Sequence, residues 1–580
     1  MKTFNLAKIA TAVALIGAHQ AHADTFSYVE LPTPTDQVRH LYPIAVNDSG
    51  LAVVQGILPE NLPIDLNRLS IGTRNFIGIP SDVEDLDTYE LSYAQYTALV
   101  NALRDPDNQL PDNLRISYYF AGSYDGQAVS LYSPLDDTDP ATPEYANSTD
   151  HYFYGANNNN IRVGTATAPY REFTHQYFAS ADATEASEIT YSERDFTRRG
   201  LWYDGTQYTL IAPPETAVLG GESVLTDINE TNLAVGFASV ALSPESVTAL
   251  AECEENALEE TEINPVNICM WRRWHALQRA EADNISFNLD IPAERSIYDM
   301  RAMRWQLDAN GQVISAEPLG TLLERGEEDL NDYSSYAYAV NNNGIAVGQS
   351  WTYYDGDIGN VSRRIKMPAI FINDEVRAVT DSPDYVWGSA TDINDNNVVT
   401  GFLIKTVQGL QRYVGFTYDI ETEQLTELPG FFNGSSTIPR AINDAGLIVG
   451  SGEIEPNLST QRRRVGFLYD LENPEQGFIN LNDAVSCESP YFIVSADSVN
   501  EQGQLLSTAI IEGSYTDANG EEQVEQLVRT LQMSPVNGEL NDCDVVDQKV
   551  ERQGAAVSPW GALGILLISV LITIRRKITS

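Results

Sequence analysis

A ten-residue pattern recurs seven times in this chain of 580 residues, and it limits the fold more than any other feature. Each copy holds an Asn three positions before a Gly or another Asn. These two residue types most readily adopt a positive φ, so each copy predicts a tight turn. The copies are AVNDSGLAVV from Ala45, GANNNNIRVG from Gly155, DINETNLAVG from Asp227, AVNNNGIAVG from Ala339, DINDNNVVTG from Asp392, AINDAGLIVG from Ala441 and SVNEQGQLLS from Ser498. Their turn positions are Asn47 and Gly50, Asn157 and Asn160, Asn229 and Asn232, Asn341 and Gly344, Asn394 and Asn397, Asn443 and Gly446, and Asn500 and Gly503.

Apolar residues alternate on both sides of the predicted turn, as at Leu447 and Val449 or at Ile345 and Val347. Alternation around an Asx-Gly turn is typical of a β-hairpin. The anchoring Asn can bond backbone groups of its own turn, so we interpret it as a structural residue.

Short aromatic strands are predicted between the copies, at 200–204, 415–419 and 466–470, each followed by a turn and another strand. Units of roughly 40 to 50 residues with about four strands are typical of β-propeller blades. We therefore predict an all-β fold, a β-propeller of seven blades with helical insertions. The strand-like segment 529–533 is expected to complete the blade begun at Phe26 and to close the ring.

Two spacings between anchors, Asn47 to Asn157 and Asn229 to Asn341, are about twice as long as the last three spacings. Either two blades carry insertions or two more blades have degenerated, and 303–313 is a candidate strand and turn inside the second gap. We favour seven blades with insertions.

The propeller body is expected at 24–547. Helical apolar spacing near 80–117 and a run of Glu and Ala near 241–279 predict insertions at the rim. Insertions of this kind commonly shape binding faces, and they also occur as plain decoration. The polar stretch 548–559 is interpreted as a linker.

Both ends of the chain carry targeting patterns. A charged start, an apolar run and Ala21-His22-Ala23 are typical of a secretory signal peptide at 1–23. The apolar stretch 560–574 predicts a transmembrane or sorting segment, and the cations of 575–580 are expected to stay in the cytoplasm. The stretch is short for a span of roughly 20 residues, which suits a thin or temporary anchor.

The formal net charge is −47, and the cations of the two terminal segments lie outside the body, which is therefore still more acidic. Such a surface repels nucleic acid and anionic lipid, so no nucleic-acid partner is expected. Asp355 with Asp357, or Asn331 with Asp332, are candidate calcium ligands, although neither pair has the spacing of a calcium loop. No other cofactor is expected.

The four cysteines, Cys253, Cys269, Cys487 and Cys543, fall in the expected exported body, where oxidation is permitted. Sequence order pairs Cys253 with Cys269 and Cys487 with Cys543, and the second pair would hold the segment after the last blade to the ring. No two cysteines have the close spacing of a metal knuckle, so disulfides are predicted in place of zinc.

No catalytic motif accompanies the repeats, so no catalytic residue is predicted. The histidines of the body, His40, His151, His175 and His275, form no HxH or HExxH pattern. Neither a GxSxG elbow nor a phosphate-binding glycine loop occurs. A site built from carboxylates on several blades would leave no recognisable pattern, because Asp and Glu are common.

Tyrosines cluster in three places, where they can hold sugars or peptides beside carboxylates. Strand propensity and packing between blades explain the same residues without a ligand. The clusters are Tyr152 and Tyr154; Tyr333, Tyr336 and Tyr338; and Tyr353 and Tyr354.

The repeat A-[IV]-N-[DN]-x-G-x-[AIV]-V-G, as in 339–348 and 441–450, resembles the HAF-type extracellular repeat. With the leader and the apolar C-terminal segment, the chain is similar to a family of exported gammaproteobacterial proteins of unknown function. The resemblance implies a Gly-Gly-type sorting tail, cleavage by a rhomboid-type intramembrane protease and delivery to the surface. The segment 554–560 lacks the paired glycine, which leaves processing open, and the family offers no catalytic residues to transfer.

We expect an exported repeat protein, anchored in the membrane or sorted to the surface, that acts as a non-enzymatic binding or scaffold module for an extracellular protein or glycan. The alternative is an extracellular hydrolase with carboxylates in the propeller channel. A calcium-stabilised surface scaffold is a third hypothesis.

Overall fold

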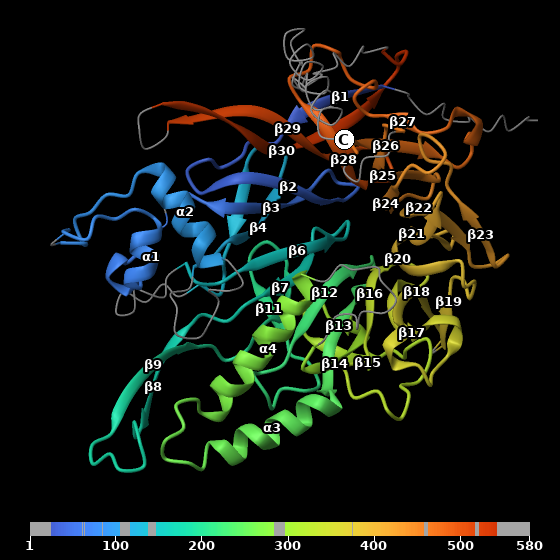
Figure 1. The fold of residues 1–580 in the computed structure, drawn as a ribbon. Coiled ribbons are helices and arrows are strands. Elements are labelled where there is room, and N and C mark those ends of the chain that lie inside the picture. Colours follow the sequence, from blue (N-terminus) through green and yellow to red (C-terminus); the bar gives the residue numbers. More distant parts are fainter. Residues whose placement is uncertain are drawn as a thin grey trace, which may run out of the picture. The chain divides into compact units, whose positions relative to one another are not determined.

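The computed structural model describes residues 25–60, 62, 64–83, 85–104, 116–136, 147–283, 296–373, 375–456, 462–516 and 521–541. These residues form seven four-stranded antiparallel sheets and one two-stranded sheet, with the first strands of the seven sheets gathered around a common centre (Figure 1). The predicted fold class, an all-β propeller of seven blades with helical insertions, is confirmed.

The blades follow one another along the chain, and each runs from its first strand near the centre to its fourth strand outside. Blade 1 contains β2 (Val38–Val46), β3 (Ala52–Pro59), β4 (Tyr119–Tyr124) and β5 (Val129–Tyr132). Blade 2 contains β6 (His151–Ala156), β7 (Arg162–Ala166), β10 (Arg199–Tyr203) and β11 (Tyr208–Ile211). Blade 3 contains β12 (Ser223–Ile228), β13 (Leu233–Leu242), β14 (Tyr298–Leu307) and β15 (Val313–Pro318).

The second half of the ring is more regular. Blade 4 contains β16 (Ser335–Val340), β17 (Ala346–Tyr353), β18 (Arg364–Ile372) and β19 (Glu375–Ala378). Blade 5 contains β20 (Tyr385–Ile393), β21 (Val398–Val407), β22 (Leu410–Asp419) and β23 (Gln424–Glu427). Blade 6 contains β24 (Thr437–Ile442), β25 (Leu447–Glu453), β26 (Arg464–Asp470) and β27 (Ile479–Asn480).

Blade 7 joins segments from the two ends of the chain. It contains β28 (Phe492–Val499), β29 (Leu505–Thr516), β30 (Glu522–Val536) and, as its outer strand, β1 (Thr25–Glu30). β1 lies beside β30 (Figure 1), where Phe26 is opposite Pro535 and Glu30 is opposite Leu531. The segment 529–533 therefore lies in the blade that β1 completes, as the sequence predicts. Pairing the two ends removes a free sheet edge where the ring closes.

Each copy of the repeat is the hairpin between the first and second strands of a blade. The turn position has a positive φ in all seven copies, at Gly50, Asn160, Asn232, Gly344, Asn397, Gly446 and Gly503. A shift in strand register occurs two residues before every anchoring Asn. This bulge frees backbone groups of the first strand from the ladder and directs them toward the next blade.

The Gly that ends five copies of the repeat is required by close packing and not by a positive φ. In the second strand of blades 2 to 6, a Cβ at this position would lie 1.8–2.2 Å from a carbonyl oxygen of the first strand. At Gly450, for example, that oxygen belongs to Ile438. No side chain fits at such a distance, so the close approach of the two strands requires Gly.

The core of the molecule lies between neighbouring blades. Between blades 2 and 3, the fully buried Trp202 and Leu225 pack in one apolar cluster with Met303 and Trp305. Burying a large apolar side chain stabilises a fold by roughly 1.5–3 kcal/mol, so the interfaces between blades hold the ring together.

The insertions lie between the second and third strands of their blades. Blade 1 carries the 3-10 helix η1 (Leu66–Arg68) with α1 (Ile71–Phe76) and α2 (Tyr93–Arg104), blade 2 carries β8 (Arg171–Tyr177) and β9 (Ser187–Glu193), and blade 3 carries α3 (Pro244–Asn256) and α4 (Val266–Asp283). Blade 7 has an extended hairpin at the same place, between β29 and β30. Short 3-10 turns η4 (Tyr354–Gly356), η5 (Val361–Arg363) and η6 (Pro474–Gln476) complete the described elements.

These insertions account for the long spacings between anchors. The described segments near 80–117 and 241–279 contain α2 and the α3–α4 pair, so both long gaps hold insertions within one blade. The segment 303–313 belongs to blade 3 itself, where it joins β14 to β15. The β8–β9 hairpin was not expected from the sequence.

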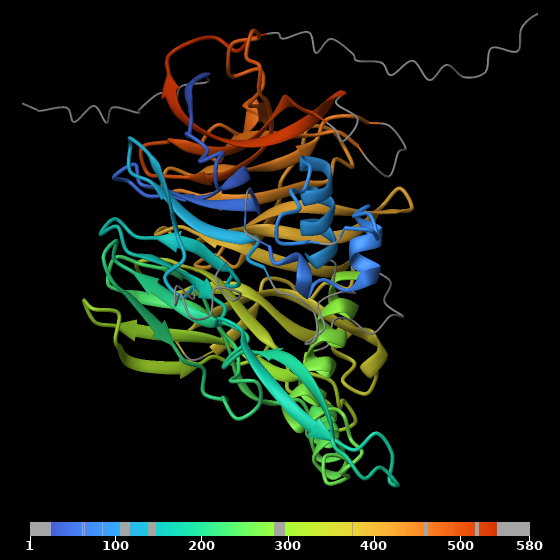
Figure 2. The same cartoon turned by 90° about the vertical axis from the view of Figure 1, so that its left-hand side faces the viewer.

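The β8–β9 hairpin runs beside the helical insertion of blade 3 (Figure 2). The Phe178 N–H donates to the carbonyl oxygen of Glu260 (2.8 Å), and the Tyr191 hydroxyl donates to that of Ile263 (2.9 Å). The insertions of blades 2 and 3 therefore form one joined structure.

Among the described residues, no helix is long and apolar enough to cross a membrane. The predicted signal peptide at 1–23 and the segments at 548–559, 560–574 and 575–580 lie outside the described residues.

Candidate functional site

The first strands of the blades surround a central channel with two different ends. Successive strands in a blade run in opposite directions, so the turn after the first strand and the connection after the second strand lie at opposite ends. We call the end with the seven repeat turns the turn end. The end with the insertions of blades 7, 1, 2 and 3 is called the decorated end.

At the turn end, the seven anchoring Asn side chains form a closed ring of hydrogen bonds. Each Asn Nδ2 donates to the backbone carbonyl oxygen of the anchoring Asn in the next blade, at 2.9–3.2 Å, and the ring closes from Asn500 to Asn47. Each Oδ1 accepts from the backbone N–H four residues later, at 2.9–3.1 Å. These residues are 2–6% exposed. The Asn thus fixes its own turn and also joins two blades.

A second ring lies beside the first. The residue after each anchoring Asn accepts, through its side-chain oxygen, the backbone N–H of the equivalent residue in the preceding blade, at 2.7–3.2 Å. The members are Asp48, Asn158, Glu230, Asn342, Asp395, Asp444 and Glu501. Burial, with Asp444, Asp48 and Asp395 nearby, raises the pKa of Glu501 to about 7. Five carboxylates therefore surround this end of the channel and are held by backbone donors.

Two more carboxylates lie deeper at the turn end, at Asp227 and Asp392. Asp227 accepts the N–H of Ile228 and, from the next blade, that of Val340, at 2.8 and 2.9 Å. Asp392 accepts two backbone N–H groups in the same arrangement. Burial raises the pKa of Asp227 to about 6 and that of Asp392 to about 7, against the effect of the N–H donors. Both oxygens of each carboxylate therefore accept a backbone N–H.

A cavity of about 380 Å³ lies toward the decorated end. Its walls come from residues of blades 2, 3, 4 and 5. The lining residues include Arg198, Glu222, Phe237, Tyr336, Tyr338, Gln349, Lys366 and Trp387, with Ser296 and Met300. Cavities of this size hold small polar molecules or single units of a polymer.

One wall of the cavity is a fixed ion pair. Arg198 donates to Glu222 Oε2 through Nε (2.7 Å) and through Nη2 (2.6 Å), and Glu222 is 1% exposed. Trp274 of α4 donates its indole N–H to the other oxygen of Glu222. The helical insertion of blade 3 thereby holds a residue of the cavity wall in place.

Another part of the wall combines a cation with aromatic rings. Lys366 Nζ lies 4.9 Å from the ring centroid of Trp351, 5.0 Å from that of Tyr336 and 5.9 Å from that of Trp387. Lys366 is 4% exposed. A buried ammonium is stabilised by aromatic faces, because their negative quadrupole attracts a cation.

A buried polar network supports this wall from beneath, between blades 3 and 4. Arg364 pairs with Asp329 (3.3 Å) and donates to the carbonyl oxygen of Asp332. Burial raises the pKa of Asp332 to about 6, although Arg364 and Lys366 oppose the shift. The Tyr353 hydroxyl donates to Asp329 Oδ2 (2.8 Å). Networks whose members are hydrogen-bonded make a rigid wall, which preorganises a site.

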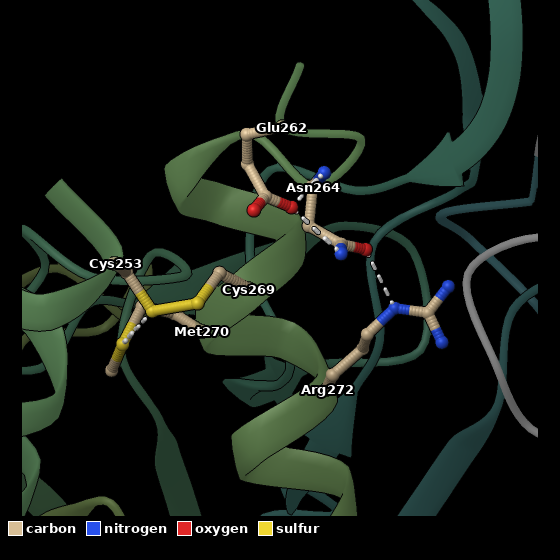
Figure 3. The surroundings of a disulfide bond; sticks show 6 residues. All are labelled: Cys253, Glu262, Asn264, Cys269, Met270 and Arg272. Atoms are coloured by element: carbon tan, nitrogen blue, oxygen red, sulfur yellow. Dashed lines mark hydrogen bonds between the residues drawn. A yellow bond between two sulfur atoms is a disulfide. The ribbon is translucent and has the colours of Figure 1, made fainter. Parts of the chain in front are cut away.

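Cys253 and Cys269 form the predicted disulfide, with their Cα atoms 5.9 Å apart, and so join α3 to α4 (Figure 3). Beside the bond, the Arg272 Nε donates to Asn264 Oδ1 (3.0 Å), and the Asn264 N–H donates to Glu262. Cys487 also takes part in a disulfide, and Cys543, its predicted partner, lies outside the described residues.

The candidate calcium ligands do not come together as a site. Asp332 belongs to the network beneath the cavity, and Asn331 donates to Asp329. Asp355 lies in η4 with a positive φ. In the described part of the chain, no group of three or more His, Cys, Asp or Glu side chains is arranged to hold a metal ion.

The four histidines are distributed among different places, and their contacts are structural. The Leu135 N–H donates to His151 Nε2, the Val528 N–H donates to His40 Nδ1, and His175 Nε2 bonds the carbonyl oxygen of Glu262. Burial lowers the pKa of His151 to about 3 and that of His40 to about 4. His275 is buried, 6% exposed.

The tyrosine clusters gave the one sequence signal that leads to the cavity. Tyr336 and Tyr338 line it, while Tyr333 and Tyr353 stack 5.5 Å apart beneath it. Sequence reasoning missed the other lining residues, among them Arg198, Glu222, Phe237, Gln349, Lys366 and Trp387. Glu222 and Trp387 each lie seven residues before an anchoring Asn, and Phe237 and Gln349 each lie eight residues after one, but the residue types differ between blades, so no motif marks them.

The model of one protein family matches residues 4–577, and its description is "Protein of unknown function (DUF3466)". No curated protein matches the chain. Among solved structures, the chain is similar to the dipeptidyl peptidase 4 of Porphyromonas gingivalis at 9% identity and a TM-score of 0.26. The match covers 68% of this chain and 47% of that one, so the chain spans about half the length of that structure. A likeness of this degree carries no argument about activity.

Proposed function

The chain belongs to the DUF3466 family, whose description names no activity, and we propose that it is an exported, non-enzymatic binding module. Its decorated end receives an extracellular protein or a glycan. The observation that carries the proposal is the cavity between Arg198 and Lys366, whose lining residues serve no repeat contact. Repeat folds commonly bind a ligand in a pocket at one end, whose lining residues differ between the repeats.

The state of the channel carboxylates supports binding over hydrolysis. A general acid or nucleophile needs an oxygen within hydrogen-bond reach of the substrate. Asp227 and Asp392 each direct both oxygens at backbone N–H groups of their own and the next blade. Releasing the Oδ2 atom of either carboxylate for chemistry would break a contact between blades.

The specific observation in favour of a hydrolase is the raised pKa of Asp227 and Asp392, since a carboxyl that titrates near pH 6–7 suits acid–base catalysis. A panel of polysaccharides and peptides tests both functions with the full chain, by measuring binding and product release together. Binding without product release supports the module. Product release that is lost in Asp392→Asn but kept in Lys366→Met would establish the hydrolase instead.

Export and attachment to the cell envelope are proposed from the leader at 1–23 and the apolar segment at 560–574. Intact mass and fractionation of the native protein test them together. A mass that begins at Asp24 and retains Lys577 supports an anchored ectodomain. A mass that ends within 554–560, with protein at the surface, supports cleavage by a rhomboid-type protease. A chain with an intact leader in the cytoplasm contradicts both.

A further inference from the structure

A second cavity, of about 250 Å³, lies where blade 4 meets the start of blade 5, and we call it the blade 4–5 pocket. Its walls come from the end of β17, from β18 and β19 and from the segment that leads into β20. Because β17 is the second strand of its blade, it ends at the decorated end. The pocket therefore lies toward the same end as the cavity between Arg198 and Lys366, with which it shares no described lining residue.

Apolar side chains form much of the wall of the blade 4–5 pocket. They include Leu322, Leu323, Ile365, Met367 and Val376. Two of them, Ile365 and Met367, are only 5% and 4% exposed. An apolar cavity of roughly 150 Å³ is large enough to hold benzene, so this pocket can receive the side chain of an aromatic or branched aliphatic residue. Close-packed proteins keep few apolar spaces of this size empty, which favours an occupant from outside the chain.

The three tyrosines that line the pocket donate their hydroxyl groups to acceptors within the fold, at 2.6–2.8 Å. The donors are Tyr353, Tyr354 and Tyr385, and their acceptors are Asp329, the carbonyl oxygen of Pro383 and Glu427. A sugar ring in this pocket would exchange its bonds to water for contacts with apolar side chains and with hydroxyls that are already bonded. Unpaired polar groups are costly to bury, so the pocket suits an apolar group better than a sugar.

The edge of the pocket carries negative charge. Asp355 and Asp381 both line the pocket and are exposed, and neither carboxylate has a hydrogen-bond or ion-pair partner among the described residues. Asp357 and Asp384 follow in the same two loops. Arg363, the cation of these loops, lies over an aromatic ring and pairs with none of the four. Carboxylates therefore outnumber cations at this edge, and local negative charge attracts a cationic group.

A peptide segment with a large apolar side chain beside a basic residue satisfies both conditions. The apolar side chain is buried in the pocket, while the basic residue stays in water near the carboxylates. Aromatic side chains inserted into pockets are frequent anchors of protein–protein interfaces.

We propose that the blade 4–5 pocket receives one large apolar side chain of an extracellular partner protein, with a Lys or Arg of that protein beside Asp355 and Asp381. The proposal rests on the proposed binding function. It names a protein, in place of a glycan, as the partner at this site.

The test is fluorine NMR of the full chain with short peptides that carry a trifluoroacetyl cap. One peptide has Phe between two Lys, the second has Phe between two Glu, and the third has Ala between two Lys. We expect the first to bind about tenfold more tightly than the third, because the phenyl ring loses its contact with water. We expect it to bind about fivefold more tightly than the second, because the Glu side chains are repelled.

A larger side chain in the wall tests the position of the pocket. Ala378 lines the pocket from the outer strand β19 and is exposed, so Ala378→Phe should occupy the space without disturbing the core. We expect the peptide with Phe between two Lys to bind about tenfold more weakly. Ala316→Phe, at an exposed position of the outer strand β15, is the matched control and should bind as the wild type does. Thermal melts establish that each variant is folded.

Removing the two carboxylates tests the charge. The double variant Asp355→Asn, Asp381→Asn should weaken binding of the same peptide about fivefold, since exposed ion pairs contribute little each. Asn also tolerates the positive φ of Asp355. Glu317→Gln on β15 removes an exposed carboxylate elsewhere and should leave binding unchanged.

Equal binding of the three peptides overturns the proposal, as does preference for the peptide with Glu, absence of peptide binding, or unchanged binding in Ala378→Phe. The proposed function fails separately. Binding followed by a new fluorine signal from a shortened peptide would leave the pocket assigned and remove the non-enzymatic role. Binding of a glycan that Ala378→Phe does not alter, with no binding of the three peptides, would leave the module and remove the protein partner.

Discussion

The two ends of the channel are built in opposite ways. At the turn end, seven blades place the same backbone and Asn atoms in the same bonds, from Asn47 around to Asn500. At the decorated end, blades 2 to 5 each contribute different residues to the cavity, from the ion pair of Arg198 to the ring of Trp387. Repetition gives stability because every copy meets its neighbour in one way, whereas recognition needs residues that no other blade repeats.

The largest loss of stability is expected where the first and second strands of a blade leave no space for a side chain. In Gly450→Ala, the new Cβ would lie 2.2 Å from the carbonyl oxygen of Ile438, so the strands of blade 6 must separate. We expect a loss of about 3 kcal/mol or more in the free energy of unfolding. Gly409→Ala is the control, since it has a positive φ but nothing within 4 Å, and should cost about 1 kcal/mol. Equal costs in urea denaturation would contradict the strand-contact explanation.

The next largest loss of stability is expected when a single anchoring Asn of the ring is replaced. Asn443→Ala removes the bond to the carbonyl oxygen of Asn500 (3.0 Å) and leaves the Leu447 N–H without its acceptor (2.9 Å). Loss of buried hydrogen bonds of this kind costs roughly 1–3 kcal/mol. Asn433→Ala, at an exposed loop position, is the matched control and should leave the melting temperature unchanged. If both variants melt alike, the ring contributes nothing.

Removing the disulfide tests whether the insertion of blade 3 can be destabilised without destabilising the blades. The double variant Cys253→Ala, Cys269→Ala removes the link between α3 and α4, which closes a loop of sequence separation 16. A loop of about 15 residues is stabilised by about 3 kcal/mol, in the insertion alone. Hydrogen exchange should therefore rise in α3 and α4 while the blades stay protected. Ligand binding should weaken as well, because α4 supplies Trp274 to Glu222. An equal loss of protection from hydrogen exchange in the blades would show that the blades and the insertion unfold together.

A change of stability with pH is also expected at the turn end. The pKa values of Asp392 and Glu501 are raised to about 7 from ordinary values of 3.8 and 4.5. The folded state therefore holds these protons more tightly than the unfolded chain, and the stability they contribute is present below about pH 4 and lost as pH rises to about 7. Urea midpoints across this range should fall with rising pH, less steeply in Glu501→Gln. Glu317→Gln, at an exposed position of β15, should keep the wild-type slope.

The repeat hairpins could be predicted from the sequence because the signals for them are local. The turn, the positive φ at positions such as Gly446, and the alternation around it all depend on residues within a few positions of one another. The bonds that join Asn443 to Asn500 were not accessible, since their partners are 57 residues apart. From the sequence, each anchoring Asn was interpreted only through the bonds within its own turn. In the structure, the same side chain also donates to the next blade.

The candidate site was largely inaccessible from the sequence. Tyr336 and Tyr338 stood out as a cluster, but Lys366 and Trp387 have no neighbours in the sequence that mark them. Arg198 and Glu222 become partners only because the starts of β10 and β12 lie side by side in neighbouring blades. The β8–β9 hairpin was missed as well, because its turn lacks the Asn pattern of the repeat.

The sequence by itself determined the hairpin repeat, the number of blades and the pairing of Cys253 with Cys269, since each depends on local patterning or short chain distances. The closing of blade 7 by β1 was predicted because a ring of blades leaves the two ends of the chain to pair with each other. Only the tertiary structure decided which polar groups meet across blades and where a cavity with a cation and aromatic walls forms. The physical reason is that a ring brings together strand ends whose separation along the chain carries no record of their contact.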